Sequence, residues 1–250
     1  NHYQDWQELC ELWASDLRTH ITNKRWVRAK DQLNSLLRKH DISNTFGGNN
    51  EVAERSDTLE SVIGHYGDAD IALSEEGILL GVCTENVRLE LNLRRGLAIQ
   101  SLAFSSHEME PCIGTLPHGH FSCISLGADY YSGGVVVELP VQRIRFTDLE
   151  KVEPRFCLKN NGNIAISAEI KTPLGVIIKI IEVSVVSEKV SLSYAFPEWD
   201  EMIGSVRLGV ITLLNQFSTE NTQLSLSNGG KYDEFFDFKG EFDHARPASS

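Results

Sequence analysis

The sequence predicts a mainly β protein in which two packed antiparallel sheets follow an α-helical hairpin. One observation is that apolar residues recur at helical spacing over the first forty residues. Another is that the period changes to two from about Leu59, with polar turn residues between the apolar segments. Twelve or more successive strands with no predicted helix between them favour antiparallel pairing, and so many strands favour two sheets over one.

Residues 1–42 predict the two helices of the hairpin. The apolar faces are formed by Trp6, Leu9, Trp13 and Leu17 in the first helix and by Trp26, Leu33, Leu36 and Leu37 in the second. Two helices cannot bury three tryptophans against each other alone, so we expect this Trp-rich hairpin to dock on another domain. Residues 43–58 are rich in Asn and Gly, and they predict a loop or linker.

Residues 59–250 predict the β domain. The expected strands are 62–66, 70–73, 77–83, 87–93, 98–104, 134–139, 143–148, 155–159, 163–171, 175–186, 189–196, 206–213, 222–226 and 234–238. Asn160-Asn161-Gly162 and Pro173-Leu174-Gly175 predict hairpin turns, and Ser187-Glu188 predicts another.

The charge balance argues against one class of partner. The chain has 250 residues and a formal net charge of −12, and residues 42–250 carry sixteen Lys/Arg against twenty-nine Asp/Glu. Such an acidic body repels phosphate backbones, so we expect no nucleic-acid partner, whereas neutral ligands such as carbohydrate remain compatible.

We expect no membrane partner and a cytoplasmic location. The longest apolar segment, 175–186, is interrupted by Lys179 and Glu182, and no secretory signal opens the chain. The five cysteines are scattered without a C-x-x-C pair, which favours buried free thiols in a reducing compartment. They are Cys10, Cys83, Cys112, Cys123 and Cys157.

Residues 89–154 carry an unusual set of polar groups for structural strands. An apolar and polar alternation leads into Arg94-Arg95-Gly96, and Leu116-Pro-His-Gly-His120 and Asp129-Tyr130-Tyr131 follow. Such a pattern suggests a β-sandwich that presents polar groups on a concave face.

These residues resemble a known family. Asn92-x-Arg-Arg-Gly-x-x-Ile99, the Leu-Pro-His-Gly-His block and the ending Asn228-Gly-Gly…Phe242-Asp-His244 look like the galactose-mutarotase-like β-supersandwich of family 57 and family 38 glycoside hydrolases. Trp13 to His20 is similar to the helical segment before that domain. The resemblance implies a sugar-facing sheet and a parent enzyme that acts on α-glucan or mannoside-like polymers.

The resemblance also implies a partner, the catalytic barrel of the parent enzyme, which would contact the Trp-rich helices. No barrel with paired carboxylates precedes residue 1, and the chain stops at Ser250, where such domains continue. We therefore expect a fragment that lacks the catalytic domain, so whether it is itself an enzyme stays open. No cofactor is expected.

His118 and His120 flank Gly119 and have three interpretations. In the first, backbone hydrogen bonds hold the loop at a domain interface. In the second, the loop contacts sugar or performs acid and base chemistry, as mutarotase-like enzymes do with a His and a carboxylate. With a third ligand such as Asp129 it could hold a metal, although we predict no metal site.

The remaining candidates have structural alternatives. Tyr130 and Tyr131 are expected to stack on sugar rings or to pack half-buried, and Arg94 and Arg95 are expected to bind sugar hydroxyls or to pair with acids. The predicted carbohydrate-binding set is Arg94, Arg95, His118, His120, Asp129, Tyr130 and Tyr131. The catalytic candidates are His118, His120 and Glu138.

The sequence thus favours an accessory, carbohydrate-associated β domain of a polysaccharide-processing glycoside hydrolase. One alternative is a stand-alone sugar epimerase or mutarotase that uses a His acid and a Glu base. The other is a pure interaction domain whose Trp-rich helices bind a partner.

Overall fold

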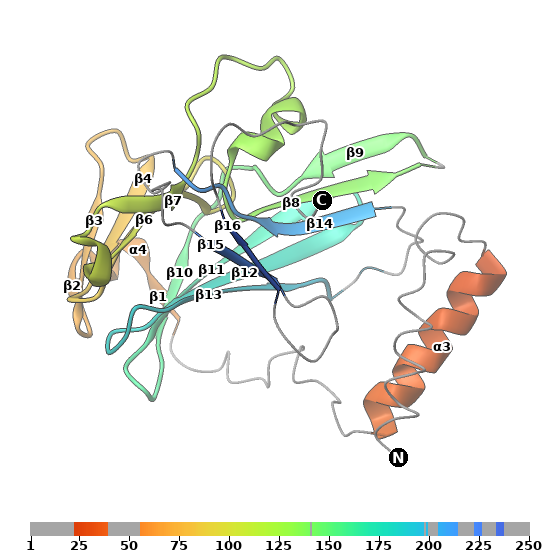
Figure 1. The fold of residues 1–250 in the computed structure, drawn as a ribbon, viewed down its shortest axis with the longest axis horizontal. Helices are drawn as coiled ribbons and strands as arrows, with labels where there is room; N and C mark the ends of the chain where they lie inside the picture. The colour runs from red at the N-terminus through yellow and green to blue at the C-terminus, as the bar shows by residue number, and fades with distance from the viewer. Residues whose placement is uncertain are drawn as a thin grey trace.

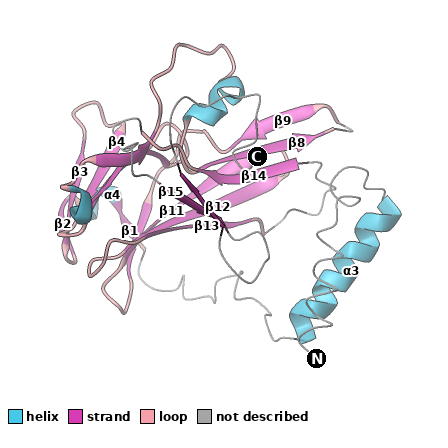
Figure 2. Cartoon of the chain, viewed as in Figure 1, coloured by secondary structure: helices cyan, strands magenta, loops and turns pink. Residues whose placement is uncertain are grey.

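A computed structural model of the chain describes residues 23–39, 56–140, 142–197, 199, 205–214, 223–226 and 234–237 (Figure 1). Within these ranges strands predominate over helices, and every strand pair is antiparallel (Figure 2). The prediction of a mainly β, antiparallel protein is therefore confirmed. In this described part, no helix combines the length and the apolar character needed to cross a bilayer.

The first sheet has six strands and follows the chain order from β2 to β7. Its strands are β2 (Gly64–Tyr66), β3 (Ala69–Leu73), β4 (Leu79–Cys83), β5 (Val87–Asn92), β6 (Ala98–Phe104) and β7 (Pro111–Gly114). In β5, the side chains of Val87, Leu89 and Leu91 are buried, as its alternating sequence predicts.

The second sheet has five strands in the order β1-β10-β11-β12-β13. They are β1 (Asp57–Thr58), β10 (Arg155–Leu158), β11 (Ile164–Thr172), β12 (Gly175–Val183) and β13 (Val190–Ala195). The predicted turns at 160–162, 173–175 and 187–188 connect β10 to β11, β11 to β12 and β12 to β13. Gly162 and Gly175 have positive φ angles, which explains glycine at both turns.

Two smaller sheets complete the described strands. The three-stranded sheet has the order β14 (Ser205–Val210), β8 (Gly134–Leu139) and β9 (Ile144–Thr147), and β15 (Gln223–Leu226) pairs with β16 (Glu234–Asp237). Single bridges from Ile99 to Ser132 and from Ile113 to Leu213 join the six-stranded sheet to segments next to β8 and β14.

The three larger sheets contribute to one hydrophobic core. Leu80 and Leu89 of the six-stranded sheet, Val135 of β8, and Ile166 and Ile181 of the five-stranded sheet are fully buried in the same cluster. Figure 1 shows the six-stranded sheet at the left of the view and the three-stranded sheet above the five-stranded one. These sheets therefore pack around one core, but the described strands form four sheets where the sequence predicts two.

Several predicted boundaries were wrong. The short strand β1 lies inside the predicted linker 43–58, and β7 lies between residues 104 and 134, where no strand is predicted because Pro111 and the acidic residues before it hide the strand pattern. Short helical segments also interrupt the strands, namely α4 (Leu59–Val62), η2 (Ser105–His107) and η3 (Ile124–Tyr130). Helical pieces this short are too brief for an apolar period to become visible.

Only part of the predicted helical hairpin is described. Helix α3 spans Asn23–Lys39 and corresponds to the second predicted helix. The first helix, most of the 43–58 linker, the Asn228-Gly-Gly and Phe242-Asp-His244 motifs and Cys10 lie outside the described residues.

Candidate functional site

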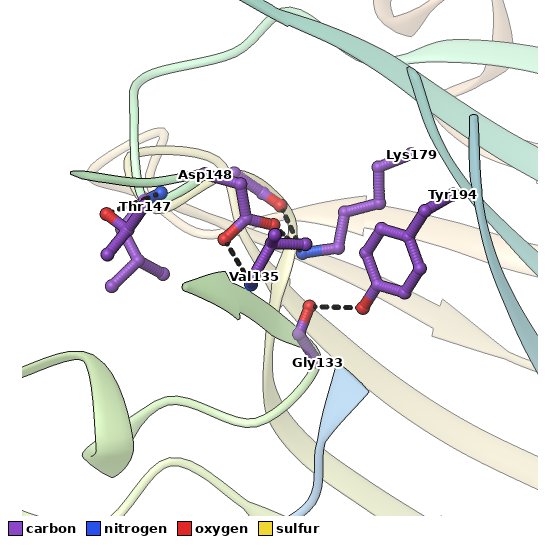
Figure 3. Close-up of polar contacts among 8 residues, drawn as sticks. Gly133, Val135, Thr147, Asp148, Lys179 and Tyr194 are labelled. Carbon is purple, nitrogen blue, oxygen red and sulfur yellow. Dashed lines mark hydrogen bonds and ion pairs between the residues drawn. The ribbon is translucent and has the colours of Figure 1, made fainter. Parts of the chain in front are cut away.

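A buried polar junction joins three parts of the fold, and it is built around the side chains of Lys179 and Asp148. Lys179 Nζ donates to Asp148 Oδ2 at 2.9 Å and to the carbonyl oxygen of Gly96 at 2.7 Å. Asp148 Oδ1 accepts from the backbone N–H of Val135 at 2.7 Å (Figure 3). We call Gly96, Asp148, Lys179 and Tyr194 the buried junction.

The local sequence explains how these groups meet. Lys179 lies on β12 between Ile177 and Ile181, so the alternation of the strand points its side chain into the core. The Tyr194 hydroxyl of the neighbouring strand β13 donates to the carbonyl of Gly133 at 2.8 Å, and its ring lies 5.8 Å from Lys179 Nζ (Figure 3).

Gly96 is required in the junction for a steric reason. Its φ angle is +58°, and a Cβ atom at this position would lie 1.9 Å from the carbonyl oxygen of Asp148. A positive φ combined with so close an approach of backbone is a position that only glycine fills without strain.

The ion pair of the junction is closed to solvent, and Tyr194 beside it is half-buried. The side chains of Lys179 and Asp148 are 0% exposed. Burial lowers the pKa of the Lys179 ammonium, and the charge and hydrogen bond of Asp148 oppose that effect. Burial also raises the pKa of the Tyr194 hydroxyl. Because the side chains of Lys179 and Asp148 have no exposed surface, this ion pair holds the sheets together and offers no surface for binding.

A second polar and aromatic cluster lies at the surface, and we call His118, Phe121, Tyr130 and Tyr131 the His118 cluster. The centroid of the His118 ring is 5.5 Å from that of Phe121, 5.3 Å from that of Tyr130 and 5.0 Å from that of Tyr131. The Phe121 and Tyr130 rings are 5.8 Å apart. These separations are typical of favourable aromatic pairs.

Hydrogen bonds fix the orientation of the His118 ring. Its Nδ1 lies 2.7 Å from the carbonyl oxygen of Gly119, and its Nε2 lies 2.9 Å from the hydroxyl of Tyr131. A carbonyl only accepts, so Nδ1 carries a proton, and in the neutral ring Nε2 accepts from the Tyr131 hydroxyl. Both nitrogens of His118 therefore have partners within the protein.

The cluster has a buried side and an open side. Tyr131 is 5% exposed and packs with Ala98, Ala128, Val136 and Leu149, whereas Tyr130 is 37% exposed. Tyr131 therefore supports the cluster from below, and Tyr130 presents its ring to solvent.

A glycine lets the Phe121 ring approach the backbone. A Cβ at Gly127 would lie 2.6 Å from Cδ2 of Phe121, so a larger residue would displace the ring. Glycine at this position of η3 thus shapes the surface of the cluster.

Charged groups adjoin the open side. Asp129, next to Tyr130 in sequence, forms an ion pair with Arg207 of β14 at 2.7 Å, with 58% and 42% of the two side chains exposed. The exposed Cys123 thiol lies 3.0 Å from Ser125 Oγ, and this hydrogen bond lowers its pKa. Exposed aromatic rings can stack on a ligand, and an exposed carboxylate and guanidinium can form paired hydrogen bonds with one.

The structure brings together only part of the predicted carbohydrate-binding set. His118, Asp129, Tyr130 and Tyr131 lie in or beside the His118 cluster, and His120 is exposed on the same loop. The backbone of Arg94 and Arg95 belongs instead to the turn of the buried junction.

Arg94 and Arg95 are predicted to pair with acids or to bind sugar hydroxyls, and Glu138 is the candidate base. In the described part of the chain, the Arg95 guanidinium donates to the carbonyl of Arg94, and neither of these arginines pairs with an acid. Glu138 faces Arg145, with Nε 3.7 Å from Oε1. Glu138 lies toward the far end of β8, whose first residue, Gly134, closely follows Tyr131 in the chain. The four residues from Gly134 to Glu138 span about 13 Å at the usual strand rise.

The described ranges contain no metal-binding cluster, and their cysteines are free. No group of three His, Cys, Asp or Glu side chains lies close enough to hold a metal ion. Cys83, Cys112, Cys123 and Cys157 are free thiols, as predicted, but only Cys112 is buried, and Cys83 and Cys123 are exposed. The expectation of burial was therefore wrong for two of them, because they occupy a strand end and a surface loop.

Sequence reasoning missed Phe121, Arg207 and the pairing of Lys179 with Asp148. Phe121 directly follows the His-Gly-His motif, so its proximity was a usable signal. Lys179 interrupts an apolar strand, which is a signal for a buried partner, but nothing in the sequence identifies that partner as Asp148.

Comparison of the chain with protein-family models, curated proteins and solved structures found no match.

Proposed function

We propose that this chain is an accessory, carbohydrate-associated β domain of a polysaccharide-processing glycoside hydrolase, and that it contacts carbohydrate through the open side of the His118 cluster. The observation that carries the proposal is the solvent-exposed ring of Tyr130, which packs with His118 and Phe121, next in sequence to Asp129 and its exposed ion pair with Arg207. Aromatic faces pack against sugar C–H groups, and charged side chains bind neighbouring hydroxyls.

The architecture is compatible with the proposed family. A galactose-mutarotase-like supersandwich needs two large antiparallel sheets around one core, and the six-stranded and five-stranded sheets share such a core. In the proposal, the helical hairpin contacts the catalytic barrel of the parent enzyme. Val27 and Leu33 of α3 are 56% and 42% exposed, which leaves apolar surface for such a contact. The free thiols support a cytoplasmic location.

A stand-alone epimerase or mutarotase receives less support. Such an enzyme would pair His118 or His120 with a Glu base, but both nitrogens of His118 already have protein partners and Glu138 faces Arg145. The open rings of the cluster also favour ligand contact over a pure interaction domain, which would leave them without a role.

The test is calorimetric titration with maltoheptaose and with mannose oligosaccharides. Tyr130→Ala and Phe121→Ala are expected to weaken binding about 5- to 150-fold, since loss of a stacked ring costs about 1–3 kcal/mol in comparable aromatic stacking. Phe235→Ala is the matched control because Phe235 is 67% exposed on β16 and outside the cluster. Absence of binding to every oligosaccharide, or equal binding by all variants, would refute the proposal.

A further inference from the structure

A second polar concavity lies at one end of the five-stranded sheet, and we call it the polar groove. It has a volume of about 240 Å³ and is lined by seven polar residues and Val186. Two turns form its walls: residues 159–163, which connect β10 to β11, and residues 184–189, which connect β12 to β13. No residue of the predicted carbohydrate-binding set lines it.

Hydrogen bonds on one side of the groove leave several polar atoms available. Asn163 Nδ2 donates to Glu182 Oε1 at 2.6 Å, and the backbone N–H of Asn163 donates to Asn161 Oδ1 at 3.0 Å. Glu182 Oε2, Asn163 Oδ1 and the side-chain amide N–H groups of Asn161 have no protein partner in the described part of the chain. The groove therefore offers both donors and acceptors.

The opposite wall adds hydroxyl groups and a cation. Ser187 Oγ donates to Ser184 Oγ at 2.9 Å, and Lys189 lines the same wall. Ser191 lies directly opposite Glu182 in the β12–β13 register, so their side chains share the outer face of the sheet. One carboxylate and one ammonium give the lining no net charge.

Contacts from the six-stranded sheet hold the 184–189 turn in place. Asn86 Nδ2 donates to the carbonyl of Val185 at 3.2 Å. The carboxylate of Glu188 accepts from Ser105 Oγ at 2.6 Å and from the backbone N–H of Ser106, and these bonds lower its pKa. A wall fixed in this way loses little conformational entropy when a ligand binds.

These observations indicate the class of ligand. The groove has no aromatic lining, so stacking is not its main interaction, and its neutral balance gives no preference for an ion. Its volume is below the roughly 300–1,000 Å³ of pockets for drug-sized ligands. A small molecule with several hydroxyl groups fits because each hydroxyl can both donate and accept.

We propose that the polar groove binds a single uncharged sugar unit, whose hydroxyls donate to Glu182 and accept from Lys189 and the Asn161 amide. This site is separate from the His118 cluster and does not depend on carbohydrate binding there. Two sites on different elements would let one domain hold a glycan at two points, which raises the overall affinity through effective concentration.

The experiment is an amide NMR titration with glucose, mannose and galactose, each up to about 100 mM, which detects the millimolar affinities of small sites. The backbone and side-chain amides of Asn161 and Asn163 and the backbone amides of 184–191 are expected to shift. Glu182→Gln is expected to weaken this binding about tenfold because a hydrogen bond to a charged acceptor is replaced by a neutral one.

Two further variants make the titration specific. Glu169→Gln is the matched control, because Glu169 lies on β11, on the same outer face of the sheet but outside the groove. Tyr130→Ala should leave these shifts unchanged, which separates failure here from failure of the His118 cluster.

Three results would overturn the proposal. The first is no shift at the groove with any of the three sugars. The second is an equal dissociation constant for the wild type and Glu182→Gln. The third is a shift with glycine but not with sugars, because it would assign the groove to a zwitterionic ligand.

Discussion

The buried junction and the His118 cluster use similar groups in opposite ways. Each holds a basic side chain beside a tyrosine ring, and the two contact the same short segment, which runs from Tyr131 to Val135. Lys179 and Asp148 are fully buried, whereas Tyr130 is 37% exposed. Access to solvent therefore separates a group that maintains the fold from a group that can meet a ligand.

Removal of one charge from the junction should have the largest effect. Lys179→Met leaves Asp148 buried without its cation and the carbonyl of Gly96 without a donor. We expect the free energy of unfolding to fall by about 3–5 kcal/mol, which is typical when one partner of a buried ion pair is lost. Urea denaturation measures this change.

A double variant sharpens that result. Asp148→Asn keeps an oxygen that can accept from Val135 N–H but removes the charge. The Lys179→Met/Asp148→Asn protein should lose less stability than the two single losses added together, because no lone charge remains. Additive losses would show that the two side chains do not act as a pair.

Gly96→Ala should have the next largest effect. The added Cβ would lie 1.9 Å from the carbonyl oxygen of Asp148, and the residue would keep a φ of +58°. Steric overlap and the left-handed backbone together should cost about 3 kcal/mol. The measurement is again denaturant unfolding.

Gly77→Ala separates the two causes in that prediction. Gly77 has a similar φ of +66°, but a Cβ there has no atom within 4 Å. Gly77→Ala should therefore lower the free energy of unfolding by only about 1 kcal/mol, which is the cost of the left-handed backbone alone. Equal losses for Gly77→Ala and Gly96→Ala would contradict the close approach of Asp148.

The free energy of unfolding at alkaline pH should report on the Tyr194 hydroxyl of the buried junction. Burial raises the pKa of its hydroxyl, so the folded protein keeps this proton at pH values where the unfolded chain releases it. The unfolded state then binds fewer protons, and folding stability falls as the pH rises above about 10. This contribution is fully present below that pH.

The Tyr194→Phe variant isolates that titration. Its free energy of unfolding should decrease less steeply with pH than that of the wild type, by about 1.4 kcal/mol per pH unit for one proton. The comparison requires denaturant curves between pH 9 and 11. Parallel pH profiles would mean that Tyr194 ionises in the folded protein as it does in the unfolded chain.

The sequence predicted the parts of the fold that depend on local pattern. The alternation in Val87–Asn92 and the Asn-Asn-Gly turn specify a strand and a hairpin, because side-chain direction and positive φ depend on a few adjacent residues. The same reasoning failed at Asp57–Thr58, where two residues form a strand only because β10 pairs with them.

The site residues also divide into those that are close together in the chain, which the sequence predicted, and those that are far apart, which it did not. The sequence placed His118, Asp129, Tyr130 and Tyr131 in one candidate set, and they lie together because η3 and its flanking loop are close in the chain. Arg207 is 78 residues from Asp129, and Lys179 is 31 residues from Asp148. Such pairs depend on how the sheets pack, and no periodicity within one strand reveals them.

A change in stability as small as that of Gly77→Ala should come from Tyr131→Phe, which tests whether a buried side chain affects the exposed surface above it. The phenyl ring still fills the space among Ala98, Ala128 and Leu149, but the hydroxyl that binds His118 Nε2 is lost. Loss of one partly buried hydrogen bond should reduce stability by about 1 kcal/mol.

The same variant should have a larger effect on ligand binding than its position suggests. Tyr131 is 5% exposed, so a change in oligosaccharide affinity would act through the orientation of the His118 ring. We expect a shift of the His118 ring nitrogen signals in NMR together with weaker binding, while Tyr130→Ala weakens binding and leaves those nitrogen hydrogen bonds intact. A changed His118 signal with unchanged affinity would show that ring orientation does not matter, and the exposed rings of Tyr130 and Phe121 would then carry the contact alone.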